Sequence, residues 1–323
     1  DPGGRGGDHA GACAAVEMTH PPLDRKGLAI TVCTFLIWGV VPLYWHLLKA
    51  VPSFHIIAHR IVWSAVLVLG WLLLKNGLGW WRQIRAQPRA VPLLGVSSLL
   101  IAFNWGLYIW AVNAGHVVET SLGYFINPLV TVALGVVVLR ERLRRPQWIA
   151  VGFALAGVAW LTVQAGSPPW IALGLAFSFG LYGLVRKTVA VDAVAGLGME
   201  SLYLFLPGLA YVVWGEFGHG GGFIDGYGWR DDLLLVLGGV VSAVPLIGFA
   251  YGVRRIPLSV VGLLQYVAPS LQLLIGVLVF KEAFDATRAV GFAAIWAGLV
   301  IFASDGLWRA RRRDALVAAS AGK

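Results

Sequence analysis

Two apolar stretches of the chain each carry a proline at their centre, with hydrogen-bonding side chains around it. In the first stretch, Thr120, Tyr124, Asn127 and Thr131 recur at spacings of three and four residues, which places them on one face of a helix. Pro128 removes one backbone hydrogen bond and frees the carbonyl four residues back, that of Tyr124. Hydroxyl, amide and free carbonyl groups hold a solute without covalent chemistry, so this stretch predicts a binding site.

The second stretch repeats this plan 141 residues further along the chain. Pro269 takes the place of Pro128, Gln265 and Gln272 continue the polar face, and Tyr266 lies beside them. The carbonyl freed by this second proline is that of Gln265. Free carbonyls at membrane depth are tolerated only against protein or a water-filled cavity, so we expect both stretches to line one cavity. The alternative is that the prolines only kink packed helices.

Arg60 lies inside another apolar segment, next to His59. A charged side chain at the centre of a membrane helix costs at least about 2.5–3.5 kcal/mol, so Arg60 needs a partner. We expect an ion pair with Glu119 near the outer mouth of the cavity, with His59 and Asn113 close by, in a gating role. Two alternatives remain: the pair only holds two helices together, or the arginine extends to lipid head groups.

Aromatic and amide side chains fall in the middle of neighbouring apolar segments. Trp63, Asn104 with Trp105, and Tyr108 could form an aromatic wall suited to an amphipathic organic solute, and Tyr182 is a further candidate. The alternative for each of them is simple packing.

Three more charged residues lie near the ends of apolar segments, and the sequence favours a solvated role for each. Glu200 and Asp305 could carry a proton, but an interfacial carboxylate is more often solvated, and Arg186 fits a simple role in membrane topology.

The nucleotide-binding, zinc-hydrolase and serine-hydrolase patterns G-x-x-x-x-G-K-[ST], H-E-x-x-H and G-x-S-x-G are absent. We therefore expect no catalytic residues, no enzyme activity, no metal and no cofactor.

The elements that position these residues follow from composition. The chain is 58% hydrophobic and only 13% charged, with a mean hydropathy of +0.76, whereas soluble domains carry about 25% charged residues. A bilayer-spanning helix needs roughly 20 apolar residues. The sequence predicts ten such helices and an all-α integral membrane protein, with spans at about 27–46, 53–74, 91–112, 117–139, 146–165, 169–187, 195–215, 233–252, 257–280 and 285–306.

The distribution of positive charge predicts the orientation. Eighteen Lys and Arg residues lie on one side of the predicted spans and four on the other (Lys49, Arg230, Lys281 and Arg288), so both termini are expected in the cytoplasm. Such loops account for the net charge of +9 without a nucleic-acid partner. Residues 1–24 are expected to be a disordered tail rather than a signal peptide, with Met18 a candidate start, and 309–323 a basic cytoplasmic tail.

The two proline stretches belong to a longer internal repeat. Gly135 matches Gly276 and Glu141 matches Glu282 at the same offset, so residues 25–166 and 167–308 are predicted to be two copies of five helices. Because five is odd, the second copy enters the membrane from the opposite side. Inverted repeats of this kind are a common transporter plan, with the solute site near the membrane midplane.

These features resemble the EamA-type drug/metabolite transporter superfamily. The resemblance covers residues 25–308 and includes the strings AHRIVWS (58–64), NWGLYIWAVN (104–113), ETSLGYFINPLV (119–130), LGLAFSFGLYGLVRK (173–187) and LQYVAPSL (264–271). It implies a permease for small organic solutes, drugs or metabolites in a bacterial plasma membrane, working by alternating access, with protons as a candidate coupling ion and a homodimer as a candidate assembly. A channel-like facilitator and a non-transporting membrane scaffold are the alternatives.

Overall fold

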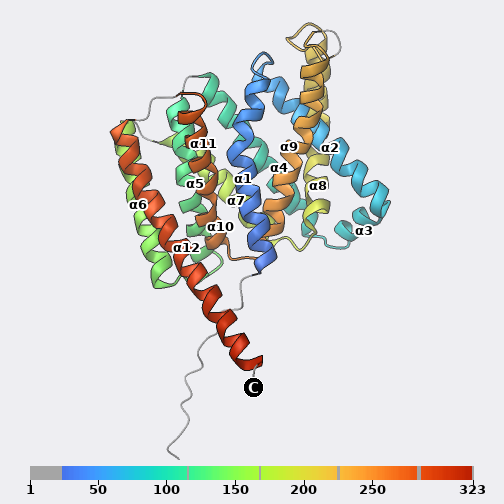
Figure 1. The fold of residues 1–323 in the computed structure, drawn as a ribbon. Coiled ribbons are helices and arrows are strands. Elements are labelled where there is room, and N and C mark those ends of the chain that lie inside the picture. The colour runs from blue at the N-terminus through green and yellow to red at the C-terminus, as the bar shows by residue number, and fades with distance from the viewer. Residues whose placement is uncertain (1–23, 115, 167–168, 224–225, 282–284, 322–323) are drawn as a thin grey trace, which may run out of the picture.

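The structure, a computed structural model, describes residues 24–114, 116–166, 169–223, 226–281 and 285–321. Every regular element in these ranges is a helix (Figure 1). The helices are α1 (Arg25–Leu47), α2 (Ser53–Asn76), α3 (Gly79–Arg85), α4 (Ala90–Asn113), α5 (Val117–Val137), α6 (Arg145–Ala165), α7 (Trp170–Thr188), α8 (Ala193–Glu216), α9 (Trp229–Val253), α10 (Leu258–Gln265), α11 (Val267–Leu278) and α12 (Ala286–Ala321).

The predicted spans correspond to these helices with three differences. The predicted span 257–280 is divided into α10 and α11 at Tyr266, three residues before Pro269. The short helix α3 forms where a loop was expected, and α12 continues through the basic segment that was expected to be a tail. The break is consistent with the backbone hydrogen bond that a proline removes.

Nine spans in the described part of the chain are long and apolar enough to cross a membrane, with α10 and α11 counted as one. The predicted sixth span is present as α7 but is not among these nine. It has 19 residues, and its last turn carries Arg186 and Lys187, which lower its apolar character.

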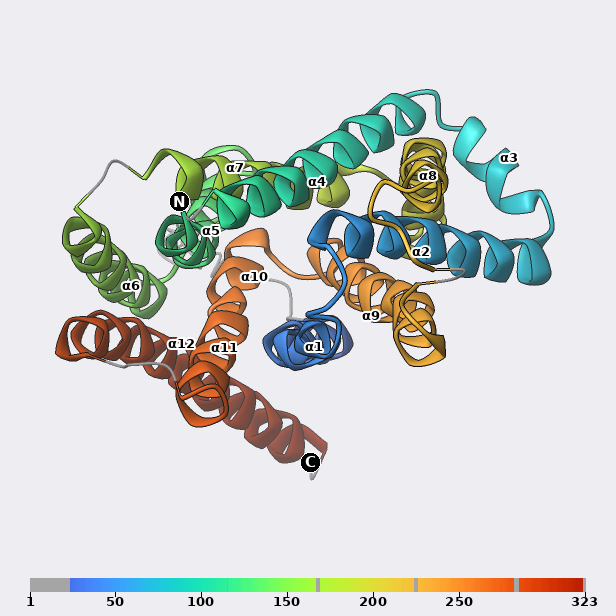
Figure 2. The same cartoon turned by 90° about the horizontal axis from the view of Figure 1, so that it is seen from above.

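The packing of the helices has matched partners in the two halves of the chain. In the predicted repeat, α1 corresponds to α7, α2 to α8, α4 to α9, α5 to α10–α11 and α6 to α12. The first-half helix α1 packs on α9 and α11, and its counterpart α7 packs on α4 and α5. The pairs α2–α8 and α6–α12 also contact each other, and Figure 2 shows them at opposite ends of the molecule with α1, α5, α7, α10 and α11 between them.

The helices α5 and α11 end in the same backbone geometry. In α5, the N–H groups of Val138 and Leu139 both donate to the carbonyl of Leu134, and Arg140 then has a φ of 56°. In α11, the same pattern recurs 141 residues further on, and Lys281 has a φ of 58°. A positive φ is uncommon for a residue with a side chain, so its recurrence at corresponding positions is a structural trace of the sequence repeat.

Small residues allow close approach where the two halves meet. A Cβ on Gly157 of α6 would lie 2.5 Å from the carbonyl oxygen of Gly291 in α12, and one on Gly298 would lie 2.7 Å from the carbonyl oxygen of Ala150. These three glycines let the backbones of α6 and α12 approach closely. Gly152, elsewhere on α6, has open space around it.

Candidate solute-binding site

Arg60 of α2 lies among aromatic rings from two other helices. Its guanidinium carbon is 4.6 Å from the ring centre of Trp45 in α1 and 4.7 Å from that of Trp105 in α4, within the range of a cation–π interaction. Its Nε donates a hydrogen bond of 2.8 Å to Ser242 Oγ of α9, and that hydroxyl donates to the Gly238 carbonyl at 2.7 Å. Helices from both halves of the chain therefore hold this one charged side chain.

The predicted ion pair between Arg60 and Glu119 is absent from this structure. Glu119 lies in the first turn of α5, and its Oε1 is 3.2 Å from Nδ1 of His116. A carboxylate is stabilised at the N-terminal turn of a helix, whereas Arg60 is turned toward the indole faces and Ser242. The side chain of Asn113, expected nearby, lies outside the described part of the structure.

His59 and Trp63 both lie against Phe223, in the segment that connects α8 and α9. The His59 ring is 4.8 Å from the ring of Phe223, and the Trp63 ring is 5.9 Å from it. A Cβ on Gly239 would lie 2.6 Å from Trp63 Cβ, so Trp63 packs directly on α9. Trp63 therefore packs against Phe223 and α9 rather than in the predicted aromatic wall. His59, predicted beside the ion pair, is one residue from Arg60 and so is turned from it by about 100°.

Two tyrosines form the wall near Arg60. The rings of Tyr108 in α4 and Tyr124 in α5 meet edge to face at 5.9 Å, and both phenols are close enough to interact electrostatically with Arg60. Asn104, one turn earlier in α4, donates to the Leu175 carbonyl at 2.8 Å and to Ser178 Oγ at 2.9 Å. Its amide group therefore ties α4 to α7.

On the polar face of α5 the Tyr124 ring is accessible, whereas Thr120, one turn before it, is 2% exposed. Tyr124 is 42% exposed, whereas Thr131, two turns later, is 1% exposed. Between them, Oδ1 of Asn127 is enclosed without a hydrogen-bond partner, as is the hydroxyl of Thr131. Pro128 is also buried, against Gly262 of α10. The accessible space around Tyr124 therefore does not continue along this face of α5.

The corresponding residues of α10 and α11 are also turned inward. Gln265 is 4% exposed, and both polar atoms of its side chain are enclosed without a partner. The Tyr266 hydroxyl donates to the Phe125 carbonyl of α5 at 3.1 Å, and the Gln272 amide donates to the Trp38 carbonyl of α1 at 3.0 Å. Pro269 is buried. These polar groups face the other helices rather than lipid.

A cluster of five aromatic residues, here called the aromatic plug, fills the interior beyond this space. Its members are Phe35 and Trp38 of α1, Phe179 and Tyr182 of α7, and Phe249 of α9, with ring centres 5.1–6.3 Å apart. Phe35, Tyr182 and Phe249 are almost fully buried. The sequence predicted Tyr182 as a cavity residue; it is fully buried in the plug, where it also lines a small hollow of about 30 Å³ with Trp105 and Glu200.

The helix ends beyond the plug, where α1 begins and where α5, α7 and α9 end, are here called the basic end. There the Glu141 carboxylate accepts from the backbone N–H groups of Leu258 and Ser259 at 2.7 and 2.8 Å, and from Ser259 Oγ at 2.7 Å. Lys187 Nζ lies 3.7 Å from the same carboxylate. This cluster, here called the Glu141 lock, fastens the end of α5 to the start of α10.

Further contacts bind the same end together. Lys187 Nζ donates to the carbonyls of Val253 and Ile256 at 2.9 and 2.7 Å, which joins α7 to the end of α9. Arg255 Nε lies 3.6 Å from the Asp24 carboxylate at the start of α1. The basic end is therefore held by ion pairs and hydrogen bonds between the two halves of the chain.

A buried ion pair lies between α7 and α8. Nη1 of Arg186 is 3.4 Å from Oε1 of Glu200, and both side chains are almost fully buried. The Ser97 hydroxyl donates to the same carboxylate at 2.5 Å. The sequence suggested a solvated role for both charges. Their opposite signs at the facing ends of neighbouring spans were the signal that could have paired them.

Asp305, the other carboxylate considered as a proton carrier, is paired as well. Its Oδ2 lies 3.5 Å from Nη1 of Arg144, and only 10% of its side chain is exposed. This pair joins the start of α6 to α12, so a structural role accounts for Asp305.

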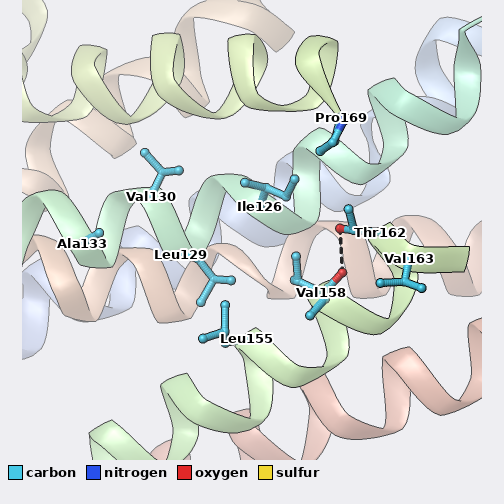
Figure 3. A pocket seen from close by; sticks show the side chains of 10 residues that line it. Ile126, Leu129, Val130, Ala133, Leu155, Val158, Thr162, Val163 and Pro169 are labelled. Atoms are coloured by element: carbon cyan, nitrogen blue, oxygen red, sulfur yellow. Dashed lines mark hydrogen bonds between the residues drawn. The ribbon is translucent and has the colours of Figure 1, made fainter. Parts of the chain in front are cut away.

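One hollow, of about 470 Å³, is an apolar groove between α5 and α6 and is separate from Arg60. Figure 3 shows its lining, which includes Ile126 and Leu129 of α5 and Leu155 and Val158 of α6. Its single hydroxyl, that of Thr162, donates back to the Val158 carbonyl at 2.8 Å. This groove offers no free polar group to orient a solute, so the candidate site is the space around Arg60.

Comparison with known proteins finds one family and several relatives that match most of the chain. The family described as "EamA-like transporter family" matches residues 25–163 and again residues 168–304. "Protein RarD" of Streptomyces exfoliatus is 47% identical over 298 residues, which cover 92% of this chain and 94% of that protein. A Pseudomonas aeruginosa protein named as an uncharacterized transporter is 45% identical over 291 residues, covering 90% of this chain and 96% of that protein.

The fold is also found among solved structures. One crystal structure matches with a TM-score of 0.67 and 22% sequence identity, covering 85% of this chain and 96% of that one, which shows a shared fold. The two matches to one family model, the extent of the relatives and the apolar helices point to the same class of protein. The chain is therefore a multi-pass membrane transporter and belongs to the EamA-like transporter family.

Proposed function

We propose that the chain is a secondary transporter of small organic solutes, drugs or metabolites, which works by alternating access between two inverted five-helix halves. The observation that carries the proposal is a difference between the two ends of the helix bundle. Tyr124 is 42% exposed and Arg60 beside it is partly exposed, whereas the aromatic plug and the Glu141 lock close the basic end. A transporter open to one side has this arrangement, and exchange of open and closed ends completes the cycle.

The matched packing of the two halves supports this mechanism. The plug and the lock are each built from helices of both halves, so a rocking of one half against the other would loosen both of them. The counterpart contacts of α1 with α11 and of α7 with α5 supply the symmetry that the reverse state requires. On this proposal the basic end lies in the cytoplasm.

The test is solute exchange across the membrane of proteoliposomes. Vesicles containing the purified protein are loaded with an unlabelled mixture of small organic solutes, and uptake of each labelled solute is followed with and without a pH gradient. An alternating-access transporter gives saturable uptake that is accelerated by the same solute on the far side. A facilitator lacks this acceleration, and a scaffold moves nothing, so either result contradicts the proposal.

A crosslink between α1 and α9 tests whether these two helices must separate during transport. A Cβ on Gly248 would lie 3.5 Å from Thr34 Cβ, within the usual separation for a disulfide. In a background with Cys13 and Cys33 replaced by serine, we expect the pair T34C and G248C to stop exchange when oxidised and to restore it when reduced. The two single-cysteine variants are the matched controls. Full exchange by the crosslinked protein would contradict opening between these helices.

A further inference from the structure

The charge of Arg60 has no counter-charge in the structure. No carboxylate of the described residues lies within ion-pair distance of it; Glu119 contacts His116, and Glu141 and Glu200 pair with Lys187 and Arg186. An arginine side chain keeps its proton at any physiological pH. A positive charge is therefore held inside the membrane-spanning bundle by two indole rings and one hydroxyl.

The free part of this guanidinium is its outer edge. Its Nε–H is used by Ser242, whereas no described group accepts a hydrogen bond from either Nη atom. The two Nη atoms are also not among the enclosed polar atoms that lack a partner, so they reach accessible space. Four N–H donors in a plane remain available, in the arrangement that binds both oxygens of a carboxylate.

The walls around this edge suit a flat, apolar body. Trp45 and Trp105 cover the guanidinium, and the rings of Tyr108 and Tyr124 lie close by. Buried aromatic walls with a few fixed polar groups are typical of sites for small organic molecules. A single cation among four rings matches one negative charge better than the two charges of a phosphate monoester.

We propose that Arg60 anchors the carboxylate of a small organic monoanion whose apolar or aromatic body rests against Trp45, Trp105, Tyr108 and Tyr124. The inference rests on the proposed transport function and assigns its substrate class. The carboxylate would bind end-on to both Nη atoms, because Ser242 occupies the side that includes Nε. Binding would neutralise the positive charge of Arg60, which no described carboxylate balances.

Direct binding to the purified full-length protein tests the assignment. The probes are 3-phenylpropionate, 3-phenylpropionamide and 2-phenylethylamine, which present similar ring and chain bodies with a negative, neutral or positive group. Binding is measured by thermal stabilisation and by quenching of tryptophan fluorescence. We expect the anion to bind about tenfold or more tightly than the amide, as a charge-assisted hydrogen-bonded pair predicts, and the amine to bind least.

Variants of Arg60 connect this preference to the side chain. R60Q is expected to remove the preference for the anion, and R60K to keep part of it, because lysine retains the charge but not the planar pair of donors. K75Q is the matched control, since Lys75 of α2 also lies over an aromatic ring, 5.1 Å from the centre of Trp71, but takes no part in the site or in the contacts at the basic end. Its variant should bind the anion as the wild type does.

The outcomes separate this inference from the proposed function. Wild-type protein that binds the amide or the amine as tightly as the anion overturns the anion site, even if R60Q proves too unstable to purify. An unchanged anion preference in R60Q overturns it as well. In the proteoliposome test, exchange of neutral or cationic solutes alone would leave transport standing without the anion site, and absence of any exchange would reject the transport function.

Discussion

The Glu141 lock provides a perturbation whose size can be worked from its contacts. E141Q leaves one acceptor oxygen where the carboxylate has two, and it removes the negative charge facing the first turn of α10 and Lys187. Losing a hydrogen bond to a charged group costs about 1.5–3 kcal/mol. Losing a charge at a helix N-terminus costs about 0.3–1 kcal/mol more. The substitution should therefore weaken the closed basic end by about 2–4 kcal/mol.

Hydrogen–deuterium exchange measures this weakening at the backbone N–H groups that the Glu141 carboxylate binds. The N–H groups of Leu258 and Ser259 are bonded to the carboxylate, so a peptide covering 257–265 reports opening of the lock. A loss of about 2–4 kcal/mol corresponds to exchange about 30- to 1,000-fold faster at these amides, at about 1.4 kcal/mol for each factor of ten. The measurement uses the folded protein in detergent or nanodiscs, with the wild type in parallel.

E119Q is the control, because it makes the same chemical change at the opposite end of α5, where Glu119 contacts His116. It should leave exchange of the 257–265 peptide unchanged. The reasoning is refuted if folded E141Q protects this peptide as well as the wild type does, or if E119Q accelerates its exchange to the same extent.

Three further substitutions test the packing. E200Q leaves Arg186 as an unpaired buried charge and should cost about 3–5 kcal/mol, seen as a lower midpoint of thermal unfolding; a midpoint equal to that of the wild type would contradict the pairing. G157V drives a side chain into the backbone of α12 and should destabilise the protein, whereas G152V, with open space around it, should not; equal effects would contradict this contact. F249A opens a cavity in the plug at a cost of about 3–5 kcal/mol, and the leak of small solutes from proteoliposomes should rise; an unchanged leak would exclude a sealing role.

The sequence by itself determined the class of protein and the places of its helices. Helix length follows from bilayer thickness and rise per residue, and both can be read from the apolar runs. Pro269 indicated an interrupted helix, and the offset of 141 residues anticipated the shared geometry at Arg140 and Lys281. These features are local or periodic, so they need no knowledge of which helix faces meet.

The partners of the charges were decided by the tertiary structure. Arg60 was predicted to pair with Glu119, yet Ser242 and two indoles surround it, and Glu200 was expected to be solvated, yet it lies buried against Arg186. Each outcome depends on the rotation of a helix about its axis and on partners from other helices, which for Arg60 include Ser242, 182 residues away. Hydropathy is nearly uniform around a buried membrane helix, so it does not reveal that rotation. Packing between the two halves of the chain sets it, and with it the site around Arg60.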